Sequence, residues 1–170
     1  MERALVVYES MFGNTRVVAD AVGVALAEDG QVDVVEVASA PDVLPDDVDL
    51  LVVGAPTHAF SLSCASTRRL AADQATGGLV SAGRGVREWL DALQPPTRPV
   101  TARAFDTRIE RGWFTGSAAR TITARLCRQG FPRSGAPRSF YVVGTCGPLQ
   151  AGDVERAAAW ARTIRAASRA

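Results

Sequence analysis

A short polar loop near the amino terminus has the residue types and the position of a phosphate-binding loop. The run Ser10-Met11-Phe12-Gly13-Asn14-Thr15 comes just after the apolar residues 4–8 and leads into an amphipathic segment, so it joins a buried strand to a helix. The first backbone N–H groups of a helix have no intrahelical partner, and the helix dipole adds partial positive charge at that end. A phosphate can therefore be bound there without a lysine, and this chain contains none.

The side chains of this loop suit the close approach of an anion. Gly13 and the small hydroxyl side chains let the backbone reach a phosphate, and Thr15 adds a hydroxyl donor at the start of the helix. The alternative is an ordinary turn after the first strand, because Ser, Gly, Asn and Thr are all common turn residues. The position of the loop between strand and helix favours phosphate binding.

A second polar loop follows another apolar run. Residues 50–53 are entirely apolar, and the stretch Ala55-Pro56-Thr57-His58-Ala59-Phe60-Ser61 that comes after them is polar, aromatic and turn-forming. His58 and Phe60 have planar side chains that could stack on a planar ligand. Alternatively, His58 is a solvated or hydrogen-bonded bystander and Phe60 anchors the loop in the core.

A third loop, 106–116, follows an apolar stretch that ends at Phe105 and begins with Asp106-Thr107-Arg108. One interpretation is a surface ion pair between Asp106 and Arg108, which would contribute little to stability. The other is a guanidinium that lies beside a bound ligand and stabilises negative charge on it.

The remaining aromatic side chains with a possible site role lie in the third loop. Trp113 and Phe114 could cover a ligand or dock a partner, although packing in the core is the interpretation that we favour. Trp89 and Trp160 lie on predicted helices at core-like spacing and are expected to be structural.

Three cysteines, Cys64, Cys127 and Cys146, are odd in number and lie in no C-x-x-C spacing. The sequence therefore predicts neither a disulfide framework nor a zinc site, and no other metal is expected. Cys64 and Cys146 have no histidine beside them in sequence to activate a thiol, so we expect them to be buried and unreactive.

The three loops are positioned by strands that alternate with helices. Apolar runs indicate strands at 4–8, 32–37, 50–54, 100–105 and 139–143, and helical periodicity indicates helices after Thr15, around 67–74, and at 86–93, 117–128 and 153–167.

This alternation predicts an α/β fold, a three-layer sandwich built on a five-stranded parallel sheet with right-handed crossovers. With strand order 2-1-3-4-5, the loops 9–15, 55–61 and 106–116 converge at the carboxyl ends of the strands, where ligands bind in such folds. The length of 170 residues predicts a single domain over 1–170.

Charge and hydropathy exclude several classes of partner. The net charge is +1, because the chain has 19 basic residues, all arginine, and 18 acidic residues. Charges of both signs are mixed along the sequence, so we expect no basic surface that would bind nucleic acid or an anionic membrane. Neither a signal peptide nor an apolar run of membrane-spanning length is present, so we expect a cytoplasmic protein.

The motifs in these loops resemble those of the flavodoxin family over nearly the whole chain. The matching elements are Ser10 to Thr15, Gly54-Ala55-Pro56-Thr57-His58, Ala104-Phe105-Asp106-Thr107-Arg108 and Gly144-Thr145-Cys146-Gly147-Pro148-Leu149. The resemblance implies an FMN-binding flavoprotein of this strand order, with the flavin at the switch point.

By the same resemblance, specific residues would contact FMN. Ser10, Gly13, Asn14 and Thr15 would hold the phosphate, with the backbone N–H groups of Met11 and Phe12; Pro56, Thr57, His58, Ala59 and Phe60 would flank the ring, and Phe105, Asp106, Thr107 and Arg108 would lie on its other side. The second loop lacks the tryptophan or tyrosine that electron-transfer flavodoxins usually place there.

Three functions remain open. The favoured one is electron transport, in which FMN carries electrons between a reductase and an acceptor protein. The second is an FMN-dependent NAD(P)H:quinone or protoporphyrinogen-type oxidoreductase, with the excursion 62–85 as a substrate wall, although no nicotinamide-binding signature is present. The third is a flavin-free binding domain on the same fold.

Overall fold

The computed structural model describes residues 3–75, 77–110, 116–132 and 135–168. Its five parallel strands form one sheet in the order β2-β1-β3-β4-β5, as predicted. The strands are β1 (Arg3–Tyr8), β2 (Gln31–Glu36), β3 (Val48–Pro56), β4 (Thr101–Ile109) and β5 (Arg138–Val142).

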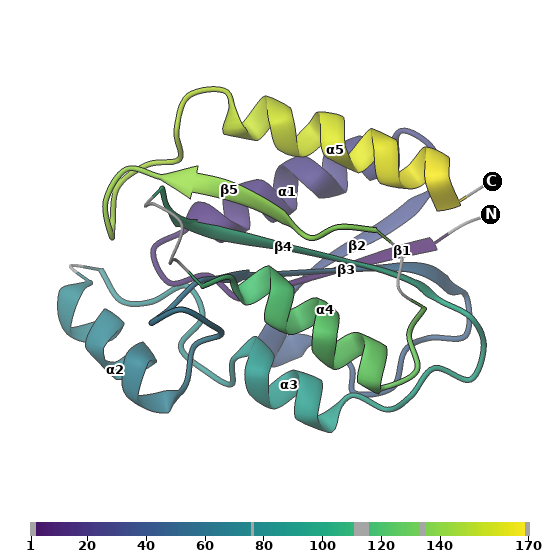
Figure 1. The fold of residues 1–170 in the computed structure, drawn as a ribbon, viewed down its shortest axis with the longest axis horizontal. Coiled ribbons are helices and arrows are strands. Elements are labelled where there is room, and N and C mark those ends of the chain that lie inside the picture. Colours follow the sequence, from purple (N-terminus) through teal and green to yellow (C-terminus); the bar gives the residue numbers. More distant parts are fainter. Residues whose placement is uncertain (1–2, 76, 111–115, 133–134, 169–170) are drawn as a thin grey trace.

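Helices cover both faces of the sheet, which makes the predicted three layers (Figure 1). The helices α1 (Asn14–Ala27) and α5 (Asp153–Ser168) lie on one face, and α3 (Val86–Ala92) and α4 (Ala118–Arg128) lie on the other. A 3₁₀ turn, η1 (Val37–Ser39), follows β2.

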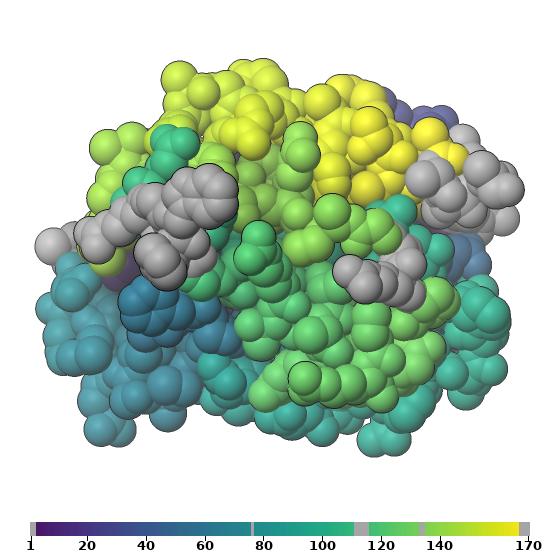
Figure 2. Space-filling view, viewed as in Figure 1, coloured from purple at the N-terminus to yellow at the C-terminus, as the bar shows by residue number. Residues whose placement is uncertain are grey.

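The alternation of side chains along β1 explains how one strand contributes to two cores. Ala4, Val6 and Tyr8 pack with α1 and α5, while Leu5 and Val7 pack in the cluster that includes α3 and α4. In Figure 2, almost no purple surface is visible, because later elements cover the beginning of the chain on this face.

Trp89 and Trp160 are buried in these cores, which confirms the prediction that they are structural. Trp160 makes edge contacts with Phe105 and Phe140, at ring-centroid distances of 6.1 Å for both. The prediction for Trp113 and Phe114 falls outside the described residues.

The predicted third loop began too early. β4 continues to Ile109, and residues 105–109 pair in parallel with 138–142 of β5. The polar residues Asp106 and Thr107, which suggested a loop, are buried and bonded to other elements. Ser117 does cap α4 as predicted, because its hydroxyl accepts from the N–H of Arg120 at 3.2 Å.

The excursion after β3 contains one helix, α2 (Ala65–Gln74), which lies beyond the carboxyl ends of the strands (Figure 1). Ala71 is the only buried residue that α2 has, whereas α1 buries seven residues against the sheet and α5. Burial of its apolar surface therefore contributes little to holding α2 in place.

Candidate functional site

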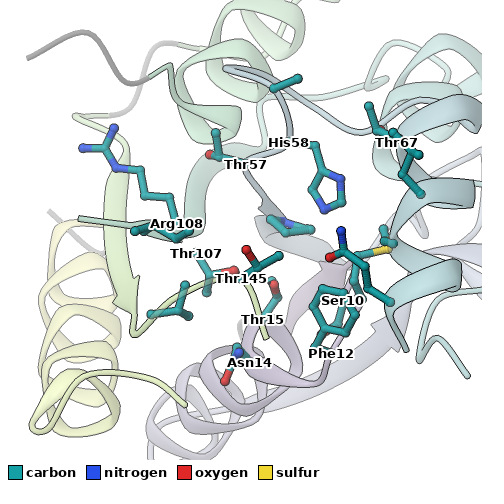
Figure 3. Close-up of a pocket in the computed structure, with 18 residues that line it drawn as sticks. Ser10, Phe12, Asn14, Thr15, Thr57, His58, Thr67, Thr107, Arg108 and Thr145 are labelled. Carbon is teal, nitrogen blue, oxygen red and sulfur yellow. Dashed lines mark hydrogen bonds between the residues drawn. The ribbon is translucent and has the colours of Figure 1, made fainter. Parts of the chain in front are cut away.

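A cleft of about 300 Å³ opens at the carboxyl ends of β1, β3 and β4, where the sequence predicts a ligand (Figure 3). This volume lies at the small end of the usual range for ligand pockets, roughly 300–1,000 Å³. Its lining comprises Ser10, Met11, Phe12, Asn14, Thr15, Pro56, Thr57, His58, Ala59, Thr67, Leu70, Ala71, Gln74, Thr107, Arg108, Ile109, Val142 and Thr145.

The 10–15 loop turns sharply into α1 at Gly13. This residue is the helix N-cap and has a φ of 95°. Glycine adopts this left-handed conformation readily, whereas residues with a Cβ atom rarely do. The buried Ser10 hydroxyl oxygen accepts from the N–H of Gly13 at 3.2 Å and from that of Arg16 at 3.3 Å. Because this oxygen is the acceptor in both bonds, the Ser10 hydroxyl proton is left for another acceptor.

Two buried threonine hydroxyls meet at the base of the cleft. Thr15 Oγ1, in the first turn of α1, and Thr107 Oγ1, on β4, lie 2.7 Å apart. The pair has two protons and uses one between its members, so the second can be donated to an acceptor in the cleft that both residues line.

Asn14 connects the first loop to the loop after β5. Its Nδ2 donates to the carbonyl oxygen of Gly147 at 2.7 Å. Thr145, from the same segment, lines the cleft. The segment is closed on itself, since Val143 donates its N–H to the carbonyl of Pro148 at 2.9 Å.

Thr57 lines the cleft, but its hydroxyl and its N–H are hydrogen-bonded to other residues of the chain. Its hydroxyl donates to Asp106 Oδ2 at 3.1 Å and accepts from the N–H of Ala118 at 2.9 Å. Its own N–H donates to the carbonyl of Thr107 at 2.9 Å. Thr57 therefore joins β3, β4 and α4 and presents no free donor to a ligand.

Phe105 and Asp106 do not line the cleft. The Phe105 ring fills the space beside Gly54, where a Cβ would lie 2.0 Å from its Cζ atom. Asp106 Oδ2 accepts from the Ser117 hydroxyl at 2.5 Å and from the N–H of Ala119 at 3.1 Å, so its carboxylate binds the N-terminus of α4. Full burial also excludes Asp106 from a surface ion pair with Arg108.

Arg108 contributes its stem to the cleft and directs its guanidinium elsewhere. Nη1 donates to the carbonyl of Gly116 at 3.1 Å, and Cζ lies 5.6 Å from the centroid of the Tyr141 ring. In Figure 3 its charged end points away from the other labelled side chains.

The second loop forms a tight turn between His58 and Ser61, whose N–H and carbonyl groups bond reciprocally at 2.8 and 2.9 Å. Ala59 and Phe60 have φ angles of 43° and 75°, which is unusual for residues other than glycine. Phe60 is 69% exposed and does not line the cleft, so the alternative that it anchors the loop in the core is wrong.

His58 lies in the cleft. Its imidazole points toward the loop that carries Ser10 and Phe12 (Figure 3). Burial lowers the pKa of His58 below its ordinary value, and the nearby positive charge of Arg68 lowers it further. The side chain is therefore a neutral, planar group at neutral pH.

Solved structures similar to this chain share its whole architecture. A flavodoxin from the domain Archaea aligns with a TM-score of 0.67 and 17% identity over 99% of both chains. Oxidised flavodoxin 1 from Bacillus cereus aligns with a TM-score of 0.67 and 16% identity over 96% of this chain and 97% of that one. This chain has the flavodoxin fold.

A flavodoxin described as WrbA-like, from Agrobacterium tumefaciens, is also similar, with a TM-score of 0.57 and 16% identity over 99% of this chain and 98% of that one. No protein-family model and no curated protein matches the sequence. On the flavodoxin fold of this chain, the cleft lies at the switch point between β1 and β3.

Sequence reasoning named no individual residue in one wall of the cleft. Four residues of α2, namely Thr67, Leu70, Ala71 and Gln74, line it, and we call them the α2 wall. Leu70 is 62% exposed. The helix predicted around 67–74 is confirmed as α2, and a substrate wall formed by the excursion 62–85 was expected for the oxidoreductase alternative, but none of these four side chains was named as a site residue. Sequence reasoning also did not name Ile109, Val142 and Thr145 as site residues. Their positions in the cleft depend on where β4 and β5 end, which the sequence did not show.

The prediction that Cys64 and Cys146 are buried was wrong. Cys146 and Cys127 are exposed, and Cys64 is half-buried at the start of α2. A hydrogen bond with Ser66, followed by bonds from Thr67, lowers the pKa of the Cys64 thiol to about 7.

Among residues 3–75, 77–110, 116–132 and 135–168, no group of three or more His, Cys, Asp or Glu side chains is placed to hold a metal ion. Within the same ranges, each helix is too short or too polar to cross a bilayer.

Proposed function

We propose that this chain binds FMN in the cleft and carries electrons between a reductase and an acceptor protein. The observation that carries the proposal is the opening of the α1 N-terminus into the cleft beside the hydroxyls of Ser10, Thr15 and Thr107. This polar end adjoins a part formed by His58 and the α2 wall, in which Leu70 and Ala71 supply apolar surface and His58 a planar side chain. A ligand with a phosphate at one end and a flat aromatic system at the other matches both parts.

The donors at the polar end fit a phosphate. They are the Ser10 hydroxyl, one proton of the Thr15–Thr107 pair and the first N–H groups of α1, all of which act without a formal charge. When bound, FMN supplies one- and two-electron transfer, which no protein side chain here provides.

Each residue of the site then has an assigned role. Ser10, Gly13, Asn14 and Thr15 hold the phosphate, with the N–H groups of Met11 and Phe12; Pro56, Thr57, His58 and Ala59 form one side of the ring site, and Thr107 and Arg108 form the other. We leave Phe60, Phe105 and Asp106 out of the contact set, because they lie outside the cleft lining. Gly13 also lies outside the lining, and it is kept because its left-handed conformation turns the loop into α1. The neutral imidazole of His58 presents an uncharged face to the ring.

The partners we propose are redox proteins of the cytoplasm. A net charge of +1 gives little long-range attraction for a strongly charged partner, so recognition depends on short-range contacts around the cleft. The shared fold with the flavodoxins supports an electron carrier.

One observation favours a second candidate, an FMN-dependent oxidoreductase that acts on a small acceptor such as a quinone. The exposed Leu70 lies on a wall of the cleft, where it would contact an apolar molecule beside the ring. Steady-state oxidation of NAD(P)H with a quinone acceptor separates the two candidates, because a carrier alone should turn over negligibly.

The proposal is tested by the flavin content of the purified protein. We expect yellow protein whose released cofactor is FMN, and flavin-free protein that recovers one equivalent on titration with FMN. Colourless protein that takes up no added FMN would instead support a flavin-free binding domain.

A further inference from the structure

The α2 wall needs something other than apolar packing to hold it against the cleft, because Ala71 is the only buried residue of the helix. Arg68 lies on the same helix, between the cleft-lining residues Thr67 and Ala71, and its side chain is 12% exposed. A guanidinium this buried requires several polar partners.

The terminal nitrogens of Arg68 bind α3 and the loop that precedes α2. Nη2 lies 2.9 Å from Glu88 Oε1 and Nη1 donates to Glu88 Oε2 at 3.2 Å, a two-pronged ion pair with α3. Nη1 also donates to the Ser63 hydroxyl oxygen at 3.0 Å. Ser63 in turn donates to Glu9 Oε1.

Glu9 connects this cluster to the 10–15 loop. It directly precedes Ser10, is 0% exposed, and its other oxygen accepts from the N–H of Val86 at 2.8 Å, at the start of α3. The three charged side chains converge beside Gly85, where a Cβ would lie 2.5 Å from Arg68 Nη1, 2.9 Å from Glu9 Oε2 and 3.0 Å from Glu88 Oε2. We call Glu9, Arg68 and Glu88 the charged cluster.

The segment just before α3 is hydrogen-bonded to the 10–15 loop, which lines the polar end of the cleft. Ser81 donates its N–H to the carbonyl of Ser10 at 2.8 Å, and the N–H of Ser10 donates to the Ser81 hydroxyl at 2.9 Å. The loop before α3 is thus fixed to the 10–15 loop, and Arg68 fixes α2 to α3.

We propose that Arg68 is the positioning residue that holds α2 as a wall of the cleft, with Glu9 and Glu88 as its anchors, so that ligand affinity depends on an ion cluster outside the cleft. The part concerning FMN rests on the proposed function. Removing the guanidinium leaves the buried Glu9 without its nearby positive charge and α2 without its main polar attachment.

The test compares Arg68→Met with Arg69→Met in the full-length chain. Arg69 is the next residue of the same helix and is exposed, so its substitution removes the same charge without touching the cluster. Amide hydrogen exchange of residues 65–74 is measured in the flavin-free proteins, and FMN affinity is measured by titration. We expect Arg68→Met to speed exchange in α2 and weaken FMN binding, each by about ten-fold, and Arg69→Met to change both by less than about two-fold.

A second pair of variants separates positioning from a general loss of stability. Arg68→Lys retains the charge and should restore part of the FMN affinity. Glu9→Gln combined with Arg68→Met removes both charges at Ser63, so the free energy of unfolding should recover while α2 still exchanges quickly.

Some outcomes would overturn the proposal. Unchanged exchange in α2, or exchange that rises equally in α1 and α5, shows that Arg68 does not position this helix. Equal FMN affinity of Arg68→Met and the unaltered chain contradicts the link to the cleft. An unaltered chain that binds no FMN, with fast α2 exchange only in Arg68→Met, defeats the proposed function and leaves the positioning role intact.

Discussion

At the scale of the residue, the polar end of the cleft relies on neutral donors. Ser10, Thr15 and Thr107 each contribute a hydroxyl, and two of these bond to each other at 2.7 Å. With no lysine in the chain, the loss of one hydroxyl is not compensated by a mobile cation. Each hydroxyl therefore has a measurable share in binding an anion.

Thr15→Val should weaken FMN binding about ten-fold, because the buried phosphate would lose a donor while the shape of the side chain is kept. Combining it with Asn14→Leu should weaken binding further, since Asn14 also holds the loop after β5. Quenching of FMN fluorescence on titration measures both. Thr97→Val, at an exposed position before β4, is the matched control, and equal affinity in all variants would show that the phosphate binds elsewhere.

The lowered pKa of His58 predicts a pH dependence of stability. The unfolded chain binds a proton at His58 near its ordinary pKa of 6.5, while the folded chain does so only at lower pH. The unfolded state thus binds more protons in this window, and the free energy of unfolding falls as the pH drops below 6.5. Above that pH the contribution of His58 is complete.

His58→Gln should remove this component. Denaturant unfolding of the unaltered chain and of His58→Gln between pH 5 and 8 gives the difference in the free energy of unfolding. The raised pKa of Glu9 makes a contribution of opposite sign, which is the same in both proteins and therefore cancels. A difference that does not vary with pH would show that the folded chain does not disfavour the charged imidazole.

The role of a single residue could be predicted from the sequence when it depends on neighbouring residues in the chain, and not when it depends on distant ones. The 10–15 loop was recognisable because its residues are neighbours at one strand–helix junction. Asp106 was not, since its role depends on Ala119 and Thr57 and on which face of β4 it occupies. Likewise, the pKa of His58 is lowered by burial and then by the charge of Arg68, and only the folded chain provides either.

At the scale of the element, α4 is held to the sheet through its N-terminus. Asp106 and Thr57 supply the acceptors for N–H groups that would otherwise have none. The sequence predicted the strands and this helix from their apolar patterns, and the strand order followed from the resemblance to the flavodoxin family. It placed α2 only approximately, around 67–74, since a helix with one buried residue has almost no apolar pattern to detect.

Asp106→Ala should lower the free energy of unfolding by about 2–4 kcal/mol, because the first turn of α4 and two hydroxyls lose a buried acceptor. Urea unfolding measures this. Asp91→Ala is the control: Asp91 pairs with Arg125 at 2.8 Å on the surface, and its loss should cost less than about 1 kcal/mol. Similar losses in the two variants would contradict the capping role of Asp106.

At the scale of the whole molecule, the near balance of charge determines how strongly a charged reactant would be attracted to the protein. Nineteen arginines face 18 acidic residues, and many form ion pairs with one another, such as Arg3 with Asp33 and Arg162 with Glu28. Paired charges of this kind produce little field beyond the Debye length, about 10 Å at 0.1 M salt. Encounter with a charged reactant should then be governed by diffusion and contact.

This predicts that reoxidation of the reduced, FMN-loaded protein depends weakly on salt. Stopped-flow rates with the anion ferricyanide and with the cation hexaammineruthenium(III) should each change by less than about three-fold between low and high ionic strength, whereas steering by a strong field changes rates ten-fold or more. A large effect of opposite sign for the two reagents would reveal a local field at the cleft. The arginines near it, rather than the net charge, would then determine which partner protein docks there, because a field confined to the cleft acts only on the surface that approaches it.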